Sequence, residues 1–482
     1  MDALLSDLQP RELWRHFLEL SKIPRGSKQE GPAAQWVADT GRALGCEVLR
    51  DAVGNVLLRK AASPGLEDRP GVALQAHVDM VCEKNEGTQH DFTRDPLQVW
   101  RDGDVLRARG TTLGADNGIG VAAALAVLST PGLRHPPLEV LVTIDEETGM
   151  TGARELRPGW LRSKYLLNLD SEEEGDLTIG CAGGIDTVAT RKVAFQSGDP
   201  GRIAWRIKVF GCKGGHSGID ISAGRANANR VLAQVLAELN ATCGLELASV
   251  HGGNKRNALA REASAVVRAG APCETKLRAE IARLQAEFRA AFGAFDPGIS
   301  LALEPAQSDR VLPAADARAL VGLLLAGPHG VEAFSPDIAG LPQTSTNMGL
   351  VETHADRVEV CFLTRSSVDS SKSALAQRIS LVCQLAGFTP EHSGGYPGWK
   401  PEPNSDVVRL VNAVHQDVFG KPMAIKAIHA GLECGLLGEK LPDCQMASIG
   451  PNMWDVHTPD EHVSIPSVAE FWRLLTAVLE RV

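Results

Sequence analysis

The stretch PPLEVLVTIDEETGM, residues 136–150, indicates how this chain folds. Leu138–Ile144 is a short, largely apolar run typical of a buried strand, and Asp145, Glu146 and Glu147 follow it directly. Open α/β sheets place their chemistry at the carboxyl ends of such strands. Neighbouring residues that leave a strand point in different directions, so the two glutamates can have different roles. The alternative is a solvated acidic turn, and partner residues at other strand ends decide between the two.

Two further apolar stretches also end in polar residues. GVALQAHVDMV (71–81) carries His77 and Asp79, and YLLNLD (165–170) ends on Asp170. Strands in this order, with a helix among them, predict an α/β sheet with polar residues at its carboxyl edge.

The segment RGTTLGADNGIGVAAALAVLS (109–129) combines a glycine-containing turn with an apolar helix. Asp116 and Asn117 stand where that helix begins, and an N-cap is the structural alternative for Asp116. The glycines loosely resemble a phosphate loop, but no G-x-x-x-x-G-K-[ST] pattern is present. The pattern therefore disfavours phosphate binding.

Length and composition place the chain among ordinary globular proteins. With 482 residues, two domains are expected, and the net charge of −10 argues against nucleic acid as the main partner. The N-terminal sequence lacks the basic and apolar regions of a signal peptide, and no apolar run has the length of a membrane span. The ten cysteines are scattered singly, as in reduced cytosolic proteins. We expect a cytoplasmic protein that contacts neither nucleic acid nor membrane.

The sequence pattern changes near residue 186 and returns to the α/β type near residue 398. Alternating strands, such as 203–210 and 358–364, and amphipathic helices, such as 273–292, predict an inserted α+β sandwich. The predicted fold is a split catalytic α/β domain with a mixed sheet flanked by helices, plus the inserted sandwich. The predicted division is 1–187 and 398–482 for the catalytic domain and 188–397 for the insert.

The predicted strand ends and the C-terminal segment supply a set of histidines and carboxylates without cysteine. The members are His77, Asp79, Asp116, Glu146, Glu147, Asp170 and His457. Such side chains bind Zn²⁺, Mn²⁺ or Co²⁺, and two metals about 3.5–4 Å apart would need one bridging carboxylate. Each residue alone could be a hydrogen-bonded structural residue or a helix cap. Their joint placement favours a two-metal site.

Several motifs in order along the chain resemble one peptidase clan. They are AHVDMV, GTTLGADNGIG, TIDEETGMTGA, NLDSEEEG, GCKGGHSGIDI and HTPDE. They resemble the co-catalytic zinc peptidases of the aminoacylase and carboxypeptidase clan. HAGLECG and YPGWKP (396–401) add similarity to its aminoacyl-histidine dipeptidase (Xaa-His dipeptidase, peptidase D) branch. The resemblance covers essentially the whole chain.

The resemblance implies two divalent metals, zinc with manganese or cobalt as alternatives. His77, Asp116 and Asp170 would hold one metal. Asp116, as the bridge, would hold the other with Glu147 and His457. Asp79 would orient His77, and Glu146 would be the general base that takes a proton from the metal-bridging water. The family's peptide bond after the bridging Asp is cis, which here is Asp116-Asn117.

The resemblance also assigns roles to residues of the insert, which would be a lid and a homodimerisation surface. His216 would polarise the scissile carbonyl, in its own subunit or across a dimer. Arg365 would bind the substrate carboxylate, with Asn257, Asn347 and Gly431 as further substrate contacts. Surface salt bridges and turns are the structural alternatives for these residues.

The expected function is hydrolysis of unblocked dipeptides, with histidine among the favoured C-terminal residues. An aminoacylase or other amidohydrolase with the same metals is the enzymatic alternative. A metal-containing binding protein is the third hypothesis, although such a protein has no need of a free Glu146 beside a ligand Glu147. Ala226 and Ala260 depart from the family's pattern and leave the preferred substrate open.

Overall fold

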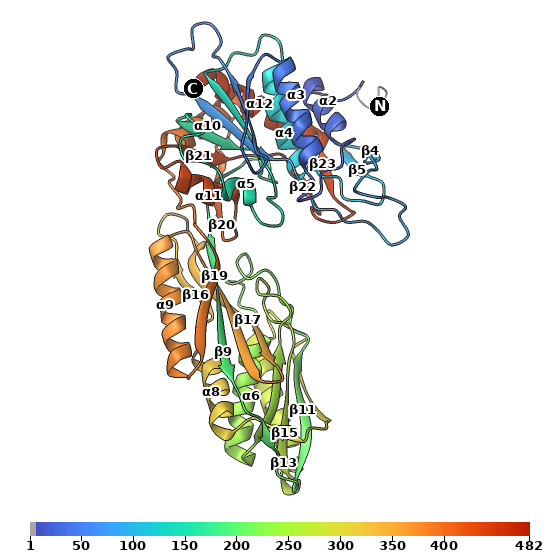
Figure 1. Ribbon diagram of the computed structural model, residues 1–482, viewed down its shortest axis with the longest axis vertical. Helices are drawn as coiled ribbons and strands as arrows, with labels where there is room; N and C mark the ends of the chain where they lie inside the picture. The colour runs from blue at the N-terminus through green and yellow to red at the C-terminus, as the bar shows by residue number, and fades with distance from the viewer. Residues whose placement is uncertain (1–5) are drawn as a thin grey trace. The chain divides into compact units, whose positions relative to one another are not determined.

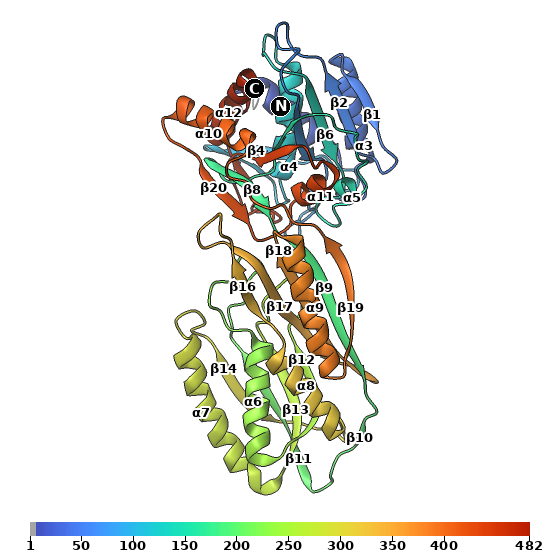
Figure 2. The ribbon, with the colours of Figure 1, turned by 90° about the vertical axis from the view of Figure 1, so that its left-hand side faces the viewer.

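The computed structural model describes residues 6–482, which pack into two compact units. Unit 1 comprises residues up to Gly180, Trp399–Ala427 and Leu432–Val482. Unit 2 comprises Cys181–Gly398 and the short segment Ile428–Gly431. Figure 1 and Figure 2 show the elements of both units in two views.

Unit 1 is built on an eight-stranded sheet. In sheet order its strands are β1 (Glu47–Arg50), β2 (Val56–Lys60), β6 (Leu138–Thr143), β3 (Val72–His77), β7 (Tyr165–Asn168), β21 (Gln445–Ser448), β8 (Asp176–Cys181) and β20 (Ala424–Ile428). The four strands β6, β3, β7 and β21 are parallel to one another, and β2 and β8 flank them in antiparallel orientation. Every residue of β3 and β6 is buried, which accounts for their mostly apolar sequences.

Helices cover this sheet. Their bounds are α2 (Arg11–Leu20), α3 (Gly31–Ala43), α4 (Ala115–Ser129), α5 (Thr151–Arg154), α10 (Asp406–Phe419), α11 (Glu433–Lys440) and α12 (Ile465–Arg481). Helix α4 packs against β3 and α2, and α10 packs against β21 and α12. The small apolar residues of α4 are buried from Ala115 to Leu128, as expected of a helix that is hydrophobic on all sides.

A small second sheet completes unit 1. Its strands in order are β22 (Met453–Trp454), β23 (His462–Ser464), β5 (Val105–Ala108) and β4 (Val99–Asp102). The sheet joins a hairpin from the segment 85–112 to the C-terminal segment, and His457 lies in the connection between β22 and β23.

Unit 2 contains a nine-stranded antiparallel sheet. The order is β14 (Ser300–Pro305), β11 (Arg202–Phe210), β13 (Ala263–Gly270), β12 (Glu246–Gly252), β17 (Pro342–Thr353), β18 (Arg357–Ser366), β9 (Gly183–Lys192) and β19 (Thr389–Tyr396), with β16 (Gly330–Phe334) also paired to β17. A two-stranded ribbon is formed by β10 (Gln196–Ser197) and β15 (Arg310–Val311). Strand β9 runs through the predicted boundary at residue 187 without interruption.

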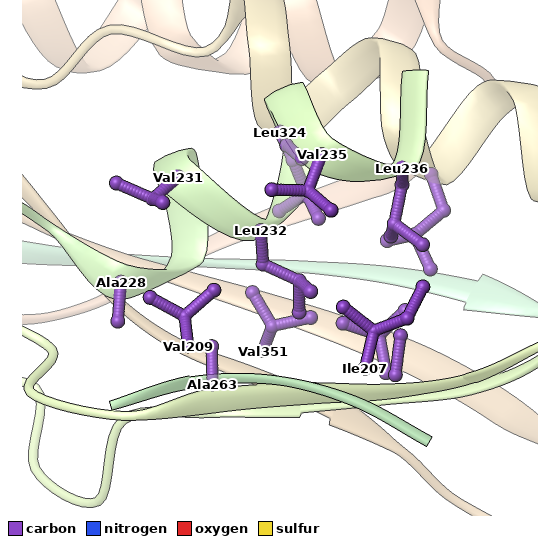
Figure 3. Close-up of a cluster of buried hydrophobic side chains, with 14 of the residues drawn as sticks. Ile207, Val209, Ala228, Val231, Leu232, Val235, Leu236, Ala263, Leu324 and Val351 are labelled. Atoms are coloured by element: carbon purple, nitrogen blue, oxygen red, sulfur yellow. The ribbon is translucent and has the colours of Figure 1, made fainter. Parts of the chain in front are cut away.

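Four helices pack on one face of the nine-stranded sheet, and the core lies between these two layers. The helices are α6 (Ala228–Cys243), α7 (Glu274–Phe292), α8 (Ala314–Ala326) and α9 (Asp369–Leu385). Alternate residues of β11, such as Ile207 and Val209, enter the core, which places them on the same face of the strand. Figure 3 shows Leu232 of α6 and Leu324 of α8 in this layer above Val351 of β17. The predicted fold class, an α/β sheet domain with an α+β sandwich, is therefore confirmed.

Among the described residues, no helix combines the length and the apolar character that crossing a membrane requires.

Replacing Leu232 with alanine should lower the free energy of unfolding by about 2–5 kcal/mol, because a cavity forms in the core of unit 2. Leu232 is fully buried, with 0% of its surface exposed. Leu381→Ala on α9 is the matched control, because that side chain is 55% exposed and its truncation should cost less than about 0.5 kcal/mol. Urea denaturation followed by circular dichroism measures both. Equal effects of the two substitutions would contradict the placement of the core.

Candidate functional site

The carboxyl ends of β3, β6 and β7 meet at one edge of the unit 1 sheet because these strands are parallel neighbours. His77 is the last residue of β3, Glu146 and Glu147 follow β6, and Asp170 follows β7. Asp116 comes from the first turn of α4. The edge therefore collects the residues that the sequence predicted at strand ends.

Asp116 lies between two imidazoles and offers one carboxylate oxygen to each. Its Oδ1 is 3.2 Å from His77 Nε2, and its Oδ2 is 3.1 Å from His457 Nε2. Each imidazole nitrogen has a second carboxylate beside it: Asp170 Oδ1 is 3.3 Å from His77, and Glu147 Oε2 is 3.0 Å from His457. The arrangement is two sets of one imidazole and two carboxylates that share Asp116.

These side chains fit a pair of divalent cations. The ligand atoms of His77, Asp116 and Asp170 lie within 4.8 Å of one another, as do those of Asp116, Glu147 and His457. The donors are imidazole nitrogens and carboxylate oxygens, the chemistry that zinc, manganese and cobalt share. Glu147 Oε1 is buried without a hydrogen-bond partner, as expected of an atom placed for a ligand.

A third group of side chains, His77, Glu146 and Glu147, also satisfies the geometry of a metal site. Glu146 therefore has an alternative placement as a ligand. No hydrogen bond links the Glu146 side chain to any described residue, whereas Asp116 joins both of the other groups.

Asp79 holds the acidic turn after β6 in place. Its carboxylate accepts hydrogen bonds from the backbone N–H groups of Glu146 and Glu147, at 3.0 and 3.2 Å, and from the Ser27 hydroxyl at 2.8 Å. Its Oδ1 also lies 3.4 Å from His77 Nδ1. A single buried carboxylate thus orients one imidazole and both glutamates.

Burial and neighbouring side chains shift the pKa values of several groups at this edge. Burial raises the pKa of Glu146 well above its usual range. Burial would also raise the pKa of Asp116, but hydrogen bonds from His457 and His77 lower it below its usual value. Hydrogen bonds to Asp116 and Glu147 raise the pKa of His457 to about 11. Opposed shifts of this kind, at one edge of a sheet, are typical of a functional site.

Two residues absent from the predicted site, Glu461 and Arg25, hold the loop before Asp116. The Glu461 carboxylate accepts backbone N–H groups from four consecutive residues, 113–116, at distances of 2.7–3.3 Å. Arg25, which is 1% exposed, donates to the carbonyl oxygens of Val78, Asp79 and Gly114. Glu461 belongs to the HTPDE motif, which was a usable signal, whereas the sequence around Arg25 contains none.

The peptide bond between Asp116 and Asn117 is cis, as the resemblance implied. The Asn117 amide donates to the Leu169 carbonyl oxygen at 3.0 Å and also contacts Asp170. Asn117 therefore joins the start of α4 to the end of β7.

A second polar cluster lies within unit 2, around Arg365. Arg365 is 4% exposed and donates to the Tyr396 hydroxyl at 3.0 Å and to Ser217 Oγ at 3.3 Å. Its Nη2 lies 3.3 Å from His216 Nε2. The other ring nitrogen of His216 accepts the backbone N–H groups of Gly218 and Ile219. Burial, followed by the charge of Arg365, lowers the pKa of His216 to about 4.

The other predicted substrate contacts lie in unit 2 without direct bonds to Arg365. The Asn347 amide donates to two backbone carbonyls, those of Arg256 and Ala258, while its buried Oδ1 has no partner. Asn257 is exposed, and its carbonyl accepts the N–H of Ser217. Gly431 ends the segment Ile428–Gly431.

The fold and this site define a metallopeptidase, and comparison with known proteins agrees. Residues 73–481 match Peptidase family M20/M25/M40, and the chain belongs to this family. The cytosol non-specific dipeptidase of Escherichia coli (strain K12) is 42% identical over 479 residues, which cover 99% of each chain. The resemblance to the dipeptidase branch of the clan is thereby confirmed.

Solved structures show the same fold. The aminoacylhistidine dipeptidase from Vibrio alginolyticus has a TM-score of 0.93 and 42% identity, covering 99% of this chain and 98% of that one. An aminopeptidase from Bacillus cereus ATCC 10987 has a TM-score of 0.56 at 15% identity, with 98% of each chain covered, and is alike in fold alone. Metal dependence belongs to the dipeptidases of this family, in agreement with the ligand groups.

Divalent cations should stabilise the protein, and Asp116→Asn should remove most of that effect, because the shared carboxylate joins both ligand groups. At a free Zn²⁺ concentration about a thousand times the dissociation constant, the gain is about 4 kcal/mol. Thermal unfolding of chelator-treated protein, with and without added Zn²⁺, measures it. Asp102→Asn, on the exposed β4–β5 hairpin, is the control that should keep the full shift. An undiminished shift in Asp116→Asn would refute the shared ligand.

Proposed function

We propose that this protein is a two-metal dipeptidase that hydrolyses unblocked dipeptides in the cytosol. The observation that carries the proposal is the shared carboxylate of Asp116 between His77 and His457, beside Glu146, whose side chain has no described hydrogen bond. The Escherichia coli relative is named a cytosol dipeptidase and the Vibrio structure an aminoacylhistidine dipeptidase, which support the substrate class and the compartment.

The proposed metals are two zinc ions, with manganese or cobalt as alternatives. His77, Asp116 and Asp170 would hold one ion, and Asp116, Glu147 and His457 the other. When bound, such a pair supplies Lewis-acid polarisation of the scissile carbonyl and lowers the pKa of a water nucleophile. Asp79 would keep His77 in its binding orientation through the contact at Nδ1.

Glu146 is the proposed general base. Burial raises the pKa of its carboxylate, so the group accepts a proton more readily than an exposed glutamate. It would take the proton from the attacking water and deliver it to the leaving amine. The neighbouring Glu147 serves as ligand, and Asp79 holds the backbone of both residues through two hydrogen bonds.

Arg365 and His216 are the proposed anion-binding pair for the substrate. His216 Nδ1 accepts two backbone N–H groups, so its proton is on Nε2. His216 Nε2 then lies 3.3 Å from Arg365 Nη2. Both nitrogens are hydrogen-bond donors, so neither satisfies the other. A carboxylate or oxyanion oxygen that accepts from both would resolve this contact.

Several finer features complete the proposal. Asn347, with its unpartnered buried Oδ1, is a candidate acceptor for a substrate N–H, and Asn257 and Gly431 are further candidate contacts. Unit 2 would act as lid and homodimerisation surface. Histidine is proposed among the favoured C-terminal residues, in keeping with the name of the Vibrio enzyme.

A substrate panel tests the function. Purified protein with Zn²⁺, Mn²⁺ or Co²⁺ should release amino acids from free dipeptides, including Xaa-His, and leave N-acyl amino acids intact. Glu146→Gln should reduce turnover by about 10²–10⁴-fold and keep both metals, because it removes the proton acceptor only. Elemental analysis and amino-acid release measure the two effects.

The control for Glu146 is Glu155→Gln, an exposed glutamate of the same segment. Preferential hydrolysis of N-acyl amino acids would replace the dipeptidase proposal by an aminoacylase. Loss of metal from Glu146→Gln would instead assign that residue to the ligand group with His77 and Glu147.

Arg365→Lys should raise the KM for dipeptides by about tenfold, which corresponds to ~1.4 kcal/mol, because lysine cannot form the bidentate fork. The fall in kcat should be smaller. Dipeptide amides, which lack the carboxylate, should show no such change in KM. Arg357→Lys, at the other end of β18 with a 40% exposed side chain, is the control. An equal loss with acids and amides would remove the carboxylate role.

A further inference from the structure

A row of buried polar side chains crosses the central strands of the unit 1 sheet. It consists of Thr143 on β6, Gln75 on β3, Asn168 on β7 and Ser448 on β21, each at most 1% exposed. Gln75 is in register with Asn168, and Asn168 with Ser448. Because buried strand positions are mostly apolar, a connected row of four polar side chains needs an explanation.

A chain of hydrogen bonds along this row leads to one carboxylate, that of Glu433. Ser448 donates to Asn168 at 2.5 Å, and Asn168 donates to Gln75 at 2.6 Å. Gln75 then donates to Glu433 Oε2 at 2.6 Å, and the Thr143 hydroxyl donates to the same oxygen at 2.6 Å. Aligned bonds of this kind polarise one another toward the final acceptor.

Glu433, like Glu461, is a buried carboxylate that the sequence analysis did not include in the site. It lies at the first position of α11, is 0% exposed, and its Oε1 is buried without a hydrogen-bond partner. Burial raises its pKa to about 7. A buried carboxylate with one unsatisfied oxygen is costly for folding, so an apolar residue would serve a purely structural purpose better.

The row lies directly behind the metal ligands. Gln75 precedes His77 by two residues, so both side chains are on the same face of β3. Thr143 pairs with His77 across the β3–β6 ladder, and Asn168 precedes Asp170 by two residues. The charge of His77 lowers the pKa of Glu433 and the charge of Asp170 raises it, so Glu433 lies within electrostatic reach of both ligand side chains. Glu433 itself belongs to none of the three ligand groups.

We propose that Glu433 is a positioning residue of the metal centre: through Gln75 and Thr143 it fixes the ends of β3 and β6, and its negative charge raises cation affinity without direct ligation. This inference rests on the two-metal function proposed above. Carboxylates that act on a metal through its ligands typically change affinity or activity by about 10–100-fold.

Glu433→Gln tests the charge while preserving the shape of the side chain. Its dissociation constant for Zn²⁺, measured by competition with a chromophoric chelator at neutral pH, should rise by about tenfold or more. At saturating Zn²⁺ the KM for dipeptide should stay near that of the wild type, because no substrate contact is lost. The matched control is Glu139→Gln, a 6% exposed glutamate at the other end of β6 that binds Arg59 and Ser163.

Glu139→Gln should lower thermal stability without weakening Zn²⁺ binding. A purely structural role for Glu433 predicts the same result for Glu433→Gln, and that outcome would overturn the proposal.

Thr143→Val provides a second route if Glu433→Gln folds poorly, since it removes one hydrogen bond to Glu433 at nearly constant volume. It should weaken Zn²⁺ binding less than Glu433→Gln, and the double variant should show less than the sum of the two effects. Unchanged Zn²⁺ binding in Thr143→Val would likewise count against the proposal.

The wild-type protein separates this inference from the function on which it rests. If the wild type binds no Zn²⁺ and cleaves no dipeptide, the two-metal function fails, and the inference fails with it. If the wild type does both and Glu433→Gln binds Zn²⁺ equally well, only the role of Glu433 is wrong.

Discussion

The sharing of one carboxylate between two imidazoles is the constraint on which the site depends. Asp116 can present Oδ1 to His77 and Oδ2 to His457 only if its backbone is fixed relative to both. Glu461 provides this by accepting four consecutive N–H groups of the loop that carries Asp116. The same carboxylate ties that loop to the segment of His457, so one short motif supplies both a candidate ligand, His457, and the carboxylate that positions Asp116.

The electrostatic balance of the edge favours the binding of cations. Five carboxylates, those of Asp79, Asp116, Glu146, Glu147 and Asp170, stand beside only two imidazoles. Removing each unpaired charge from water costs several kcal/mol, and neighbouring like charges add to that cost. Bound divalent cations would offset both the loss of hydration and the repulsion between the carboxylates. The buried acids therefore cost stability in the metal-free fold, and bound cations would recover it.

The residues that the structure brings together at this edge could be selected from the sequence because they follow apolar strands or occur in compact motifs. Strand β6 and the acids after it could be recognised from an apolar run and its abrupt end. The contacts of Glu433 and Arg25 could not, since their partners are Thr143, Gln75 and backbone carbonyls far away in the chain. Strand β17 and helix α8 have no counterpart among the predicted elements; β17 is rich in threonine, serine and asparagine, so no apolar alternation marks it. The membership of residues 428–431 in unit 2 depends on packing, not on periodicity.

The position of β21 determines the order in which the protein can be completed during synthesis. This strand occupies the middle of the unit 1 sheet, between β7 and β8, yet it is made after the whole of residues 181–398. The ribosome therefore makes the whole nine-stranded sheet of unit 2 before the first part of unit 1, up to Gly180, can pair with β21. Because His457 and Glu461 come later still, the candidate metal ligands are all available only after residues 181–398 have been made, when unit 2 has had time to fold.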